Sequence, residues 1–136
     1  MLAAEGGCAR FGWDDGYFLG PAKLVLQALE TFSKEVEENC GLILQRSKTE
    51  VFSWDNVDPA SIPSGLVRAG EVIDGQWEPG FICYGVPVGS DRYVHCKLDE
   101  KISEVSAEVA TVCEVLQDHH QALWTVLRSS ISQKLD

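Results

Sequence analysis

The chain has 136 residues, which is enough for one domain around one core, and 45% of them are hydrophobic, as is usual in globular proteins. It carries 21 acidic and 11 basic residues, for a formal net charge of −10. Such a surface repels phosphate backbones and anionic lipids, so the composition excludes a nucleic-acid clamp that works through overall charge.

The cysteine and histidine pattern predicts neither a disulfide scaffold nor a zinc site. The five cysteines are odd in number and widely spaced, without a Cys-X-X-Cys pair. On a helix, the adjacent pairs His95–Cys96 and His119–His120 would diverge, so a shared metal is not expected. Without a signal peptide or a membrane-length apolar run, we expect a soluble, intracellular protein.

The first predicted elements are a hairpin and a helix. Residues 1–10 are expected to be irregular. In FGWDDGYFLG, residues 11–20, Asp-Gly between aromatic runs predicts a β-hairpin over 11–19 with Asp14 and Asp15 at its turn. Pro21 suits the first helical position, and Gly41 follows the predicted end at Asn39. The predicted buried face of this helix comprises Leu24, Val25, Ala28, Leu29, Phe32 and Val36.

Short strands and two helices are predicted next. Residues 41–45 and 49–54 are strand candidates, and 55–66 is an irregular loop. Strands at 67–73 and 81–88 are interrupted by Asp74-Gly75 and Pro79-Gly80. Ser90 caps a helix to about residue 118, and a last helix runs from about His120 to the end. The expected apolar seam of the long helix comprises Val94, Leu98, Ile102, Val105, Val109, Val112 and Leu116. This order predicts an α+β fold.

The paired aspartates have two readings. Asp-Asp-Gly is ordinary turn chemistry, and most such turns have no catalytic role. A hairpin tip with two carboxylates also suits Mg²⁺, which takes hard oxygen ligands and fills its octahedron with water and substrate phosphates. Two such ions can stabilise both the attacking and the leaving oxygen in a phosphoryl transfer. Simple Mg²⁺ or Ca²⁺ binding without catalysis is a further alternative.

Three motifs in succession carry a resemblance. FGWDDGYFLG resembles the Tyr-X-Asp-Asp hairpin in the palm of reverse transcriptases of non-long-terminal-repeat retroelements. NCGLILQRSKTEVFSW is similar to the fourth palm motif of that family, and FICYGVPVGSDRYV resembles its primer-grip element. The segment ALWTVLRSSISQKLD looks like the start of the thumb or connection region.

The resemblance implies a partial polymerase palm at residues 11–89, formed by a β-hairpin, an amphipathic helix and short antiparallel strands. It implies that two C-terminal helices at 90–136 lead into the thumb or connection region. It implies that Asp14 and Asp15 bind Mg²⁺ or Mn²⁺ and that Lys48 assists pyrophosphate departure as a proton donor. The primer-grip residues that it implies are Gly85, Pro87 and Gly89. The complete enzyme would act on an RNA template and a DNA primer.

The sequence also departs from the family pattern. Gly12 occupies the position of the motif's tyrosine, and Trp13 that of the variable residue. The family's first carboxylate motif, its substrate pocket and its fingers have no counterpart in the chain. We therefore expect a fragment that is inactive alone, binds nucleic acid weakly or not at all, and exposes apolar surface suited to self-association. The alternative is a non-catalytic interaction module or degenerate remnant that assembles through the helix at 90–118.

Overall fold

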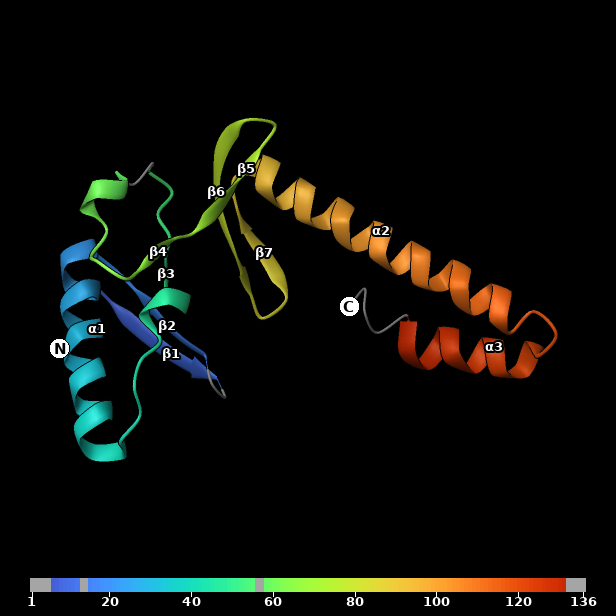
Figure 1. Ribbon diagram of the computed structural model, residues 1–136, viewed down its shortest axis with the longest axis horizontal. Coiled ribbons are helices and arrows are strands. Elements are labelled where there is room, and N and C mark those ends of the chain that lie inside the picture. Colours follow the sequence, from blue (N-terminus) through green and yellow to red (C-terminus); the bar gives the residue numbers. More distant parts are fainter. Residues whose placement is uncertain (1–5, 13–14, 56–57, 132–136) are drawn as a thin grey trace. The chain divides into compact units, whose positions relative to one another are not determined.

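The computed structural model describes residues 6–12, 15–55 and 58–131 (Figure 1). The chain divides into two compact units, residues 1–46 and 47–136, and each is described by itself. Helices and small sheets occur in both halves of the chain, so the predicted α+β class is confirmed.

The first unit is a β-hairpin followed by a helix. Strand β1 (Cys8–Gly12) pairs antiparallel with β2 (Asp15–Leu19), from Cys8 opposite Leu19 to Gly12 opposite Asp15. The predicted hairpin is confirmed but begins three residues earlier, because residues 8–10, expected to be irregular, extend β1. Its connection consists of residues 13 and 14, which lie outside the described residues.

Helix α1 (Ala22–Cys40) presents the predicted apolar face. Leu24 and Leu29 are buried, and the other four predicted residues are half-buried. Pro21 precedes the helix as its N-cap instead of occupying the first turn. Gly41 ends it with a φ of 66°, a left-handed conformation that glycine adopts without a steric penalty. Both helix boundaries therefore lie within one residue of the prediction.

The second unit starts with irregular chain and one small parallel pair. A 3₁₀ turn (Arg46–Lys48) leads into β3 (Glu50–Val51), and after a second 3₁₀ turn (Pro59–Ser61) the chain pairs β3 with β4 (Val67–Arg68). This pair is parallel, whereas the predicted short strands were antiparallel.

The strand predicted at residues 41–45 is wrong. This segment has no regular structure, and Leu42 and Ile43 are 62% and 79% exposed. Branched residues favour strands only where a partner strand and a buried face are available. No strand pairs with this segment in the described part of the chain, so its local propensity has no effect.

A three-stranded antiparallel meander follows, formed by β5 (Gly70–Ile73), β6 (Gln76–Cys83) and β7 (Val86–Gly89). Two tight turns connect its strands, Asp74-Gly75 with φ of 49° and 80°, and Tyr84-Gly85 with φ of 49° and 84°. Positive φ at both central residues is the type I′ geometry that matches strand twist.

One break in this sheet was predicted at the wrong place. Pro79 and Gly80 lie inside β6, while the segment 81–88 is divided by the turn at Tyr84. The φ of proline is compatible with an extended strand, and the carbonyl of Pro79 accepts a hydrogen bond from the Ser90 amide at 2.9 Å. Tyrosine rarely adopts positive φ, so residue type did not indicate the true turn.

Helix α2 (Asp91–Val115) follows directly, and the Ser90 hydroxyl accepts a hydrogen bond from the Tyr93 amide at 3.2 Å, as predicted for the cap. Helix α3 (His120–Val126) continues into a π-helical turn η4 (Leu127–Ile131), and both contact α2. Among the residues that the structure describes, no helix is long and apolar enough to cross a membrane.

The predicted seam of α2 is only partly buried. Val105 is 4% exposed and Val109 is half-buried, but Leu98 and Ile102 remain 44% and 55% exposed. The first turns of α2 contact β6 and β7, and later turns contact α3 and η4. The middle of the helix therefore lacks a complete cover, and the expected burial of the whole seam is wrong at Leu98 and Ile102.

The ring of Tyr93 packs α2 against the backbone of two glycines in the sheet, Gly80 and Gly89. Tyr93 is 5% exposed, and a Cβ added to Gly80 would overlap its ring. Gly89 pairs with Gly80 across the strands. A Cβ at Gly89 would be too close to Pro79, to Gly80 and to the same ring. The two paired glycines therefore leave the space in which the ring of Tyr93 packs.

We predict that Gly80→Ala lowers the free energy of unfolding by about 1–3 kcal/mol, because the new methyl must displace the Tyr93 ring. Urea denaturation measures the change. In the Tyr93→Ala background the same substitution should cost much less, since the obstacle is absent. An equal cost in both backgrounds would show that the ring is not the obstacle.

Candidate functional site

The tip of the first hairpin contains the predicted carboxylates. Asp15 is the first residue of β2, is exposed, and pairs with Gly12 across the strands. Asp14 and Trp13 lie outside the described residues. Because the register pairs Gly12 with Asp15, only two residues connect the strands, and Asp14 is one of them.

The pleat places Asp15 on the hairpin face away from the aromatic cluster. Side chains alternate along a strand, so Phe11, Gly16 and Phe18 share one face while Asp15 and Tyr17 share the other. Phe11 and Phe18 contact Phe32 of α1, with ring centroids 5.1 and 5.6 Å apart. The cluster ties one face of the hairpin to α1 and leaves Asp15 on the other.

Gly16 has a role that differs from the predicted one. It lies in β2 without a positive φ, so it does not form the turn. A Cβ at this position would lie 2.8 Å from the Phe11 ring, which is too close. Gly16 therefore provides space for an aromatic ring, and the Asp-Gly signal indicated the right hairpin for the wrong reason.

Lys48 is the exposed last residue of the 3₁₀ turn before β3. It belongs to the second unit, whereas Asp15 belongs to the first. The predicted association of this lysine with the aspartate tip therefore stays a prediction.

The three predicted primer-grip residues lie on the β6–β7 hairpin but differ in environment. Gly85 has a φ of 84° at the tip, and a Cβ there would meet open space. Pro87 pairs with Ile82 on the edge strand β7. Gly89 is buried beneath Tyr93, so its lack of a side chain serves contact within the chain. Only Gly85 and Pro87 are thus placed near the accessible end of the hairpin.

An ion-pair network that residue patterns did not predict lies between the sheet and α2. Lys97 contacts Glu71 of β5 at 2.7 Å and Glu100 of its own helix at 2.9 Å. Arg92 pairs with Asp74 at 2.5 Å and with Glu78 at 3.6 Å, and Glu78 also accepts a hydrogen bond from Ser90 at 2.7 Å. A Lys-X-X-Glu spacing signals the pair within the helix, but the contact with Glu71 depends on the fold.

These contacts shift several pKa values. Hydrogen bonds to Glu71 and then Glu100 raise the pKa of Lys97, and the hydrogen bond from Lys97 lowers the pKa of Glu100. Desolvation, followed by the charge of Glu100, raises the pKa of the Cys96 thiol. Burial is the main cause that raises the pKa of Tyr93.

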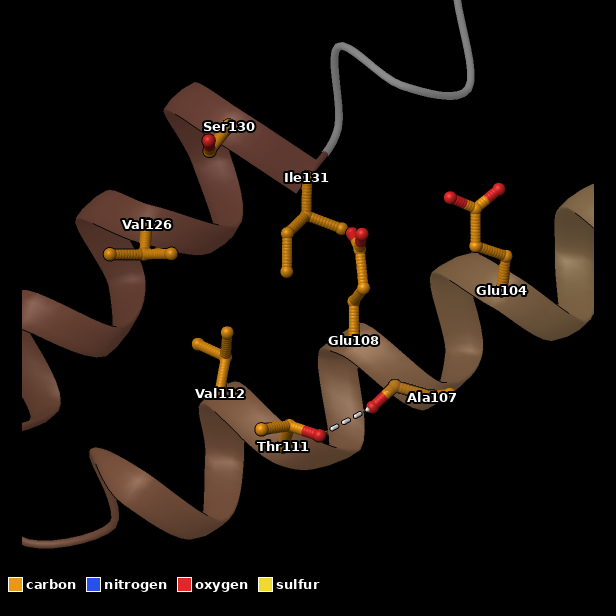
Figure 2. Close-up of a pocket in the computed structure, with 8 residues that line it drawn as sticks. All are labelled: Glu104, Ala107, Glu108, Thr111, Val112, Val126, Ser130 and Ile131. Atoms are coloured by element: carbon orange, nitrogen blue, oxygen red, sulfur yellow. Dashed lines mark hydrogen bonds between the residues drawn. The ribbon is translucent and has the colours of Figure 1, made fainter.

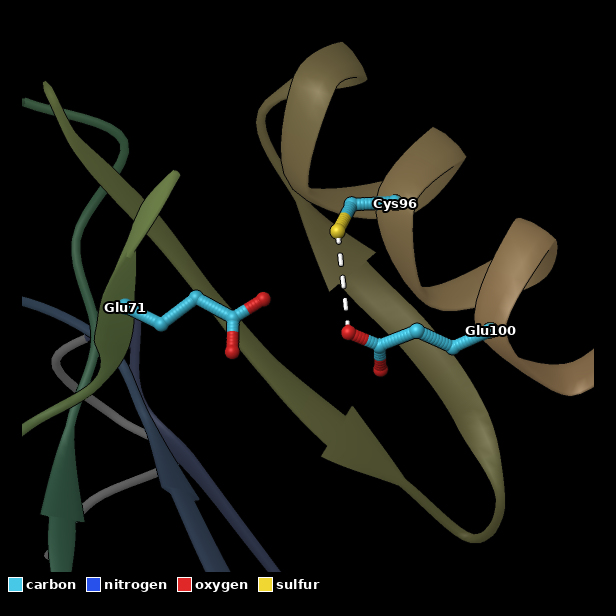
Figure 3. A group of neighbouring side chains, drawn as sticks. All are labelled: Glu71, Cys96 and Glu100. Atoms are coloured by element: carbon cyan, nitrogen blue, oxygen red, sulfur yellow. Dashed lines mark hydrogen bonds between the residues drawn. The ribbon is translucent and has the colours of Figure 1, made fainter. Parts of the chain in front are cut away.

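Glu71, Cys96 and Glu100 bring three potential ligand atoms within 4.8 Å of one another (Figure 3). The Cys96 thiol donates to Glu100 at a sulfur–oxygen distance of 3.7 Å. Lys97 already bonds both carboxylates, and a thiol with a raised pKa is a poor metal ligand. The cluster is better explained as an ion-pair junction than as a metal centre.

An open cavity of about 510 Å³ lies between α2 and the α3–η4 segment (Figure 2). Val112, Val126 and Ile131 supply apolar walls, while Glu104 and Glu108 extend from α2 beside them. The Thr111 hydroxyl of this lining donates a hydrogen bond to the Ala107 carbonyl of its own helix at 3.0 Å.

No protein-family model matches this chain, and neither does any curated protein or any solved structure.

We predict that Lys97→Met weakens the dependence of stability on acid pH. The pKa of Glu100 in the folded chain lies below its ordinary 4.5, so its contribution is present above pH 4.5 and is lost as the pH falls through the lowered value. Melting temperatures between about pH 6 and pH 3 should fall more steeply for the wild type than for Lys97→Met. Lys23→Met, which removes an exposed lysine of α1, is the control and should follow the wild type. Parallel curves for all three proteins would contradict the role of Lys97.

Proposed function

We propose that the chain is the back half of a reverse transcriptase palm together with the helical start of the thumb or connection region. In the complete enzyme, an RNA-directed DNA polymerase, this piece would carry two metal-binding aspartates. The observation that supports this most is the β1–β2 register, because it pairs Gly12 with Asp15 and so leaves Asp15 at the end of the hairpin, directly after Asp14 in the sequence.

The order of elements also supports the proposal. The resemblance implies an aspartate hairpin, a helix, a lysine before a strand, a second hairpin and then helices. The chain has β1–β2, α1, Lys48 before β3, the tight β6–β7 hairpin and α2 in that succession. The succession of these elements therefore supports the proposal more than any one motif does.

The residues at the tip fit a divalent cation of the magnesium class. Asp15 is an exposed hard-oxygen donor on the free face of a hairpin fixed by its aromatic side. Bound Mg²⁺ or Mn²⁺ would supply charge stabilisation for phosphoryl transfer. Lys48 would be the proton donor to departing pyrophosphate, and Gly85 and Pro87 would lie along the primer.

Because this piece is strongly acidic, we expect other parts of the enzyme to bind the nucleic acid. With a net charge of −10 it repels a phosphate backbone, so template and primer would be held by regions beyond these residues. A non-catalytic interaction module is the second candidate, and the exposed Leu98 and Ile102 on α2 favour it.

We predict that the chain alone does not extend a primer, because two carboxylates without a third ligand and a nucleotide pocket neither hold nor position the reactants. Fusion to the fingers and front palm of a reverse transcriptase of this type should give extension with Mg²⁺ or Mn²⁺. Asp14→Asn or Asp15→Asn should abolish that activity, whereas Asp58→Asn on an exposed loop should not.

Extension by the isolated chain that Asp14→Asn abolishes would contradict the fragment assignment. An inactive fusion would direct attention to Gly12 and Trp13, and the variant Gly12→Tyr with Trp13→Ala restores the family residues. A fusion that stays inactive with this variant would reject the polymerase proposal.

A further inference from the structure

The free face of the first hairpin carries a cation beside the aspartate tip. The register pairs Arg10 with Tyr17 and Gly12 with Asp15. Because side chains alternate along a strand, Arg10 lies on the same face as Asp15, opposite the face that contacts Phe32 of α1. Within β1 and β2, which the structure describes in full, Arg10 and Asp15 are the only charged residues, and both are exposed.

The register also sets the separation between this cation and the tip. Arg10 and Asp15 are diagonal neighbours across the strands, and the Cα atoms of such a pair lie about 7–8 Å apart. Gly12, which follows Arg10 on the same strand face, has no side chain. The long side chain of Arg10 can therefore reach a ligand that is bound at the tip.

Arg10 differs from the other arginines of the chain in its contacts. The others all have interaction partners within the chain: Arg46, Arg68, Arg92 and Arg128. In the part of the chain that the structure describes, the side chain of Arg10 has no ion pair or hydrogen bond, and it does not pair with Asp15. Its guanidinium group therefore remains available to a ligand from outside the chain.

The chemistry of this face favours a phosphate group as that ligand. A guanidinium group can bind two phosphate oxygens through parallel hydrogen bonds. Mg²⁺ characteristically shares its shell between protein carboxylates and substrate phosphates. A phosphate group that shares a cation with Asp15 would present its remaining oxygens to Arg10. In a chain with a net charge of −10, a local cation also offsets the repulsion of an incoming anion.

We propose that Arg10 is a phosphate-binding residue of the aspartate tip, and that its guanidinium group donates to a phosphate held beside Asp15. The phosphate belongs to the nucleoside triphosphate or to the primer backbone, since both present the same oxygens. This inference rests on the proposed function, because the phosphate reaches the tip together with a divalent cation. Residues 1–10 were expected to be irregular, and only the β1–β2 register puts Arg10 on the face of Asp15.

The test is NMR of the isotopically labelled full chain, in which the Nε–Hε signal of Arg10 and the amide signal of Asp15 report separately. Excess Mg²⁺ should shift the Asp15 signal. Addition of dTTP, or of a primer–template duplex in a parallel titration, should then shift the Arg10 signal, and the stronger response identifies the source of the phosphate. Without Mg²⁺, or in Asp15→Asn, the affinity measured at Arg10 should fall about tenfold, because the phosphate loses its second contact.

Kinetics of the fusion to the fingers and front palm provide a second measurement. Arg10→Met should raise the KM for the nucleotide or the Kd for the primer about tenfold, since one charge-assisted contact is lost. Arg10→Lys keeps the charge without the planar fork and should recover part of that loss. Lys23→Met, which removes an exposed cation of α1, is the matched control and should change neither constant.

The outcomes separate this inference from the proposed function. A shift of the Asp15 signal by Mg²⁺ without any phosphate response at Arg10 would overturn the role of Arg10 alone. An Arg10 response of equal strength with and without Mg²⁺ would reveal an ordinary surface cation and would overturn it as well. An Asp15 signal that Mg²⁺ leaves unchanged would reject the metal site of the proposed function, and the coupled phosphate site with it.

Discussion

The packing of the Tyr93 ring on Gly80 and Gly89 is the contact on which the attachment of α2 to the sheet depends. The ring of Tyr93 occupies the space that side chains at these two positions would fill, so the helix packs directly on the strand backbone. The ion pairs of Lys97 and Arg92 surround this apolar contact. Because they are partly exposed, their role is to fix orientation more than to supply stability. The β6–β7 hairpin and the first turns of α2 are therefore joined by an apolar contact and by ion pairs around it.

The second hairpin has exposed residues at one end and a buried residue at the other. If the hairpin touches a primer, its contacts come from Gly85 at the tip and Pro87 on the edge, and the support comes from Gly89 beneath Tyr93. One motif thus contains both exposed residues and a buried one. The first hairpin has the same division, because its aromatic face is held by Phe32 while Asp15 projects from the other face. In both hairpins a packed side supports an exposed side.

Much of this architecture follows from local sequence, and the exceptions have physical causes. Helix α1, the Ser90 cap and the first hairpin were predictable, because periodicity, capping residues and aromatic runs act over a few residues. The false strand at 41–45 and the parallel β3–β4 pair were not, since pairing depends on which distant strand is available. The turn at Tyr84 was missed because its residue type argues against positive φ. At the site, Asp15 was predicted in the turn but begins β2, and the network around Lys97 arises only when β5 meets α2.

In the segment β5–β6–β7–α2, elements that are adjacent in sequence pack on one another, and this affects how the protein folds. Each strand pairs with the next one along the chain through a two-residue turn, and α2 begins immediately after β7 and packs back on those strands. Contacts between sequence neighbours need little loop closure, and folds of this kind assemble quickly. During synthesis the segment would have all of its partners soon after α2 leaves the ribosome. It can therefore serve as an early folding nucleus, whereas β3 must wait for β4 across the loop between them.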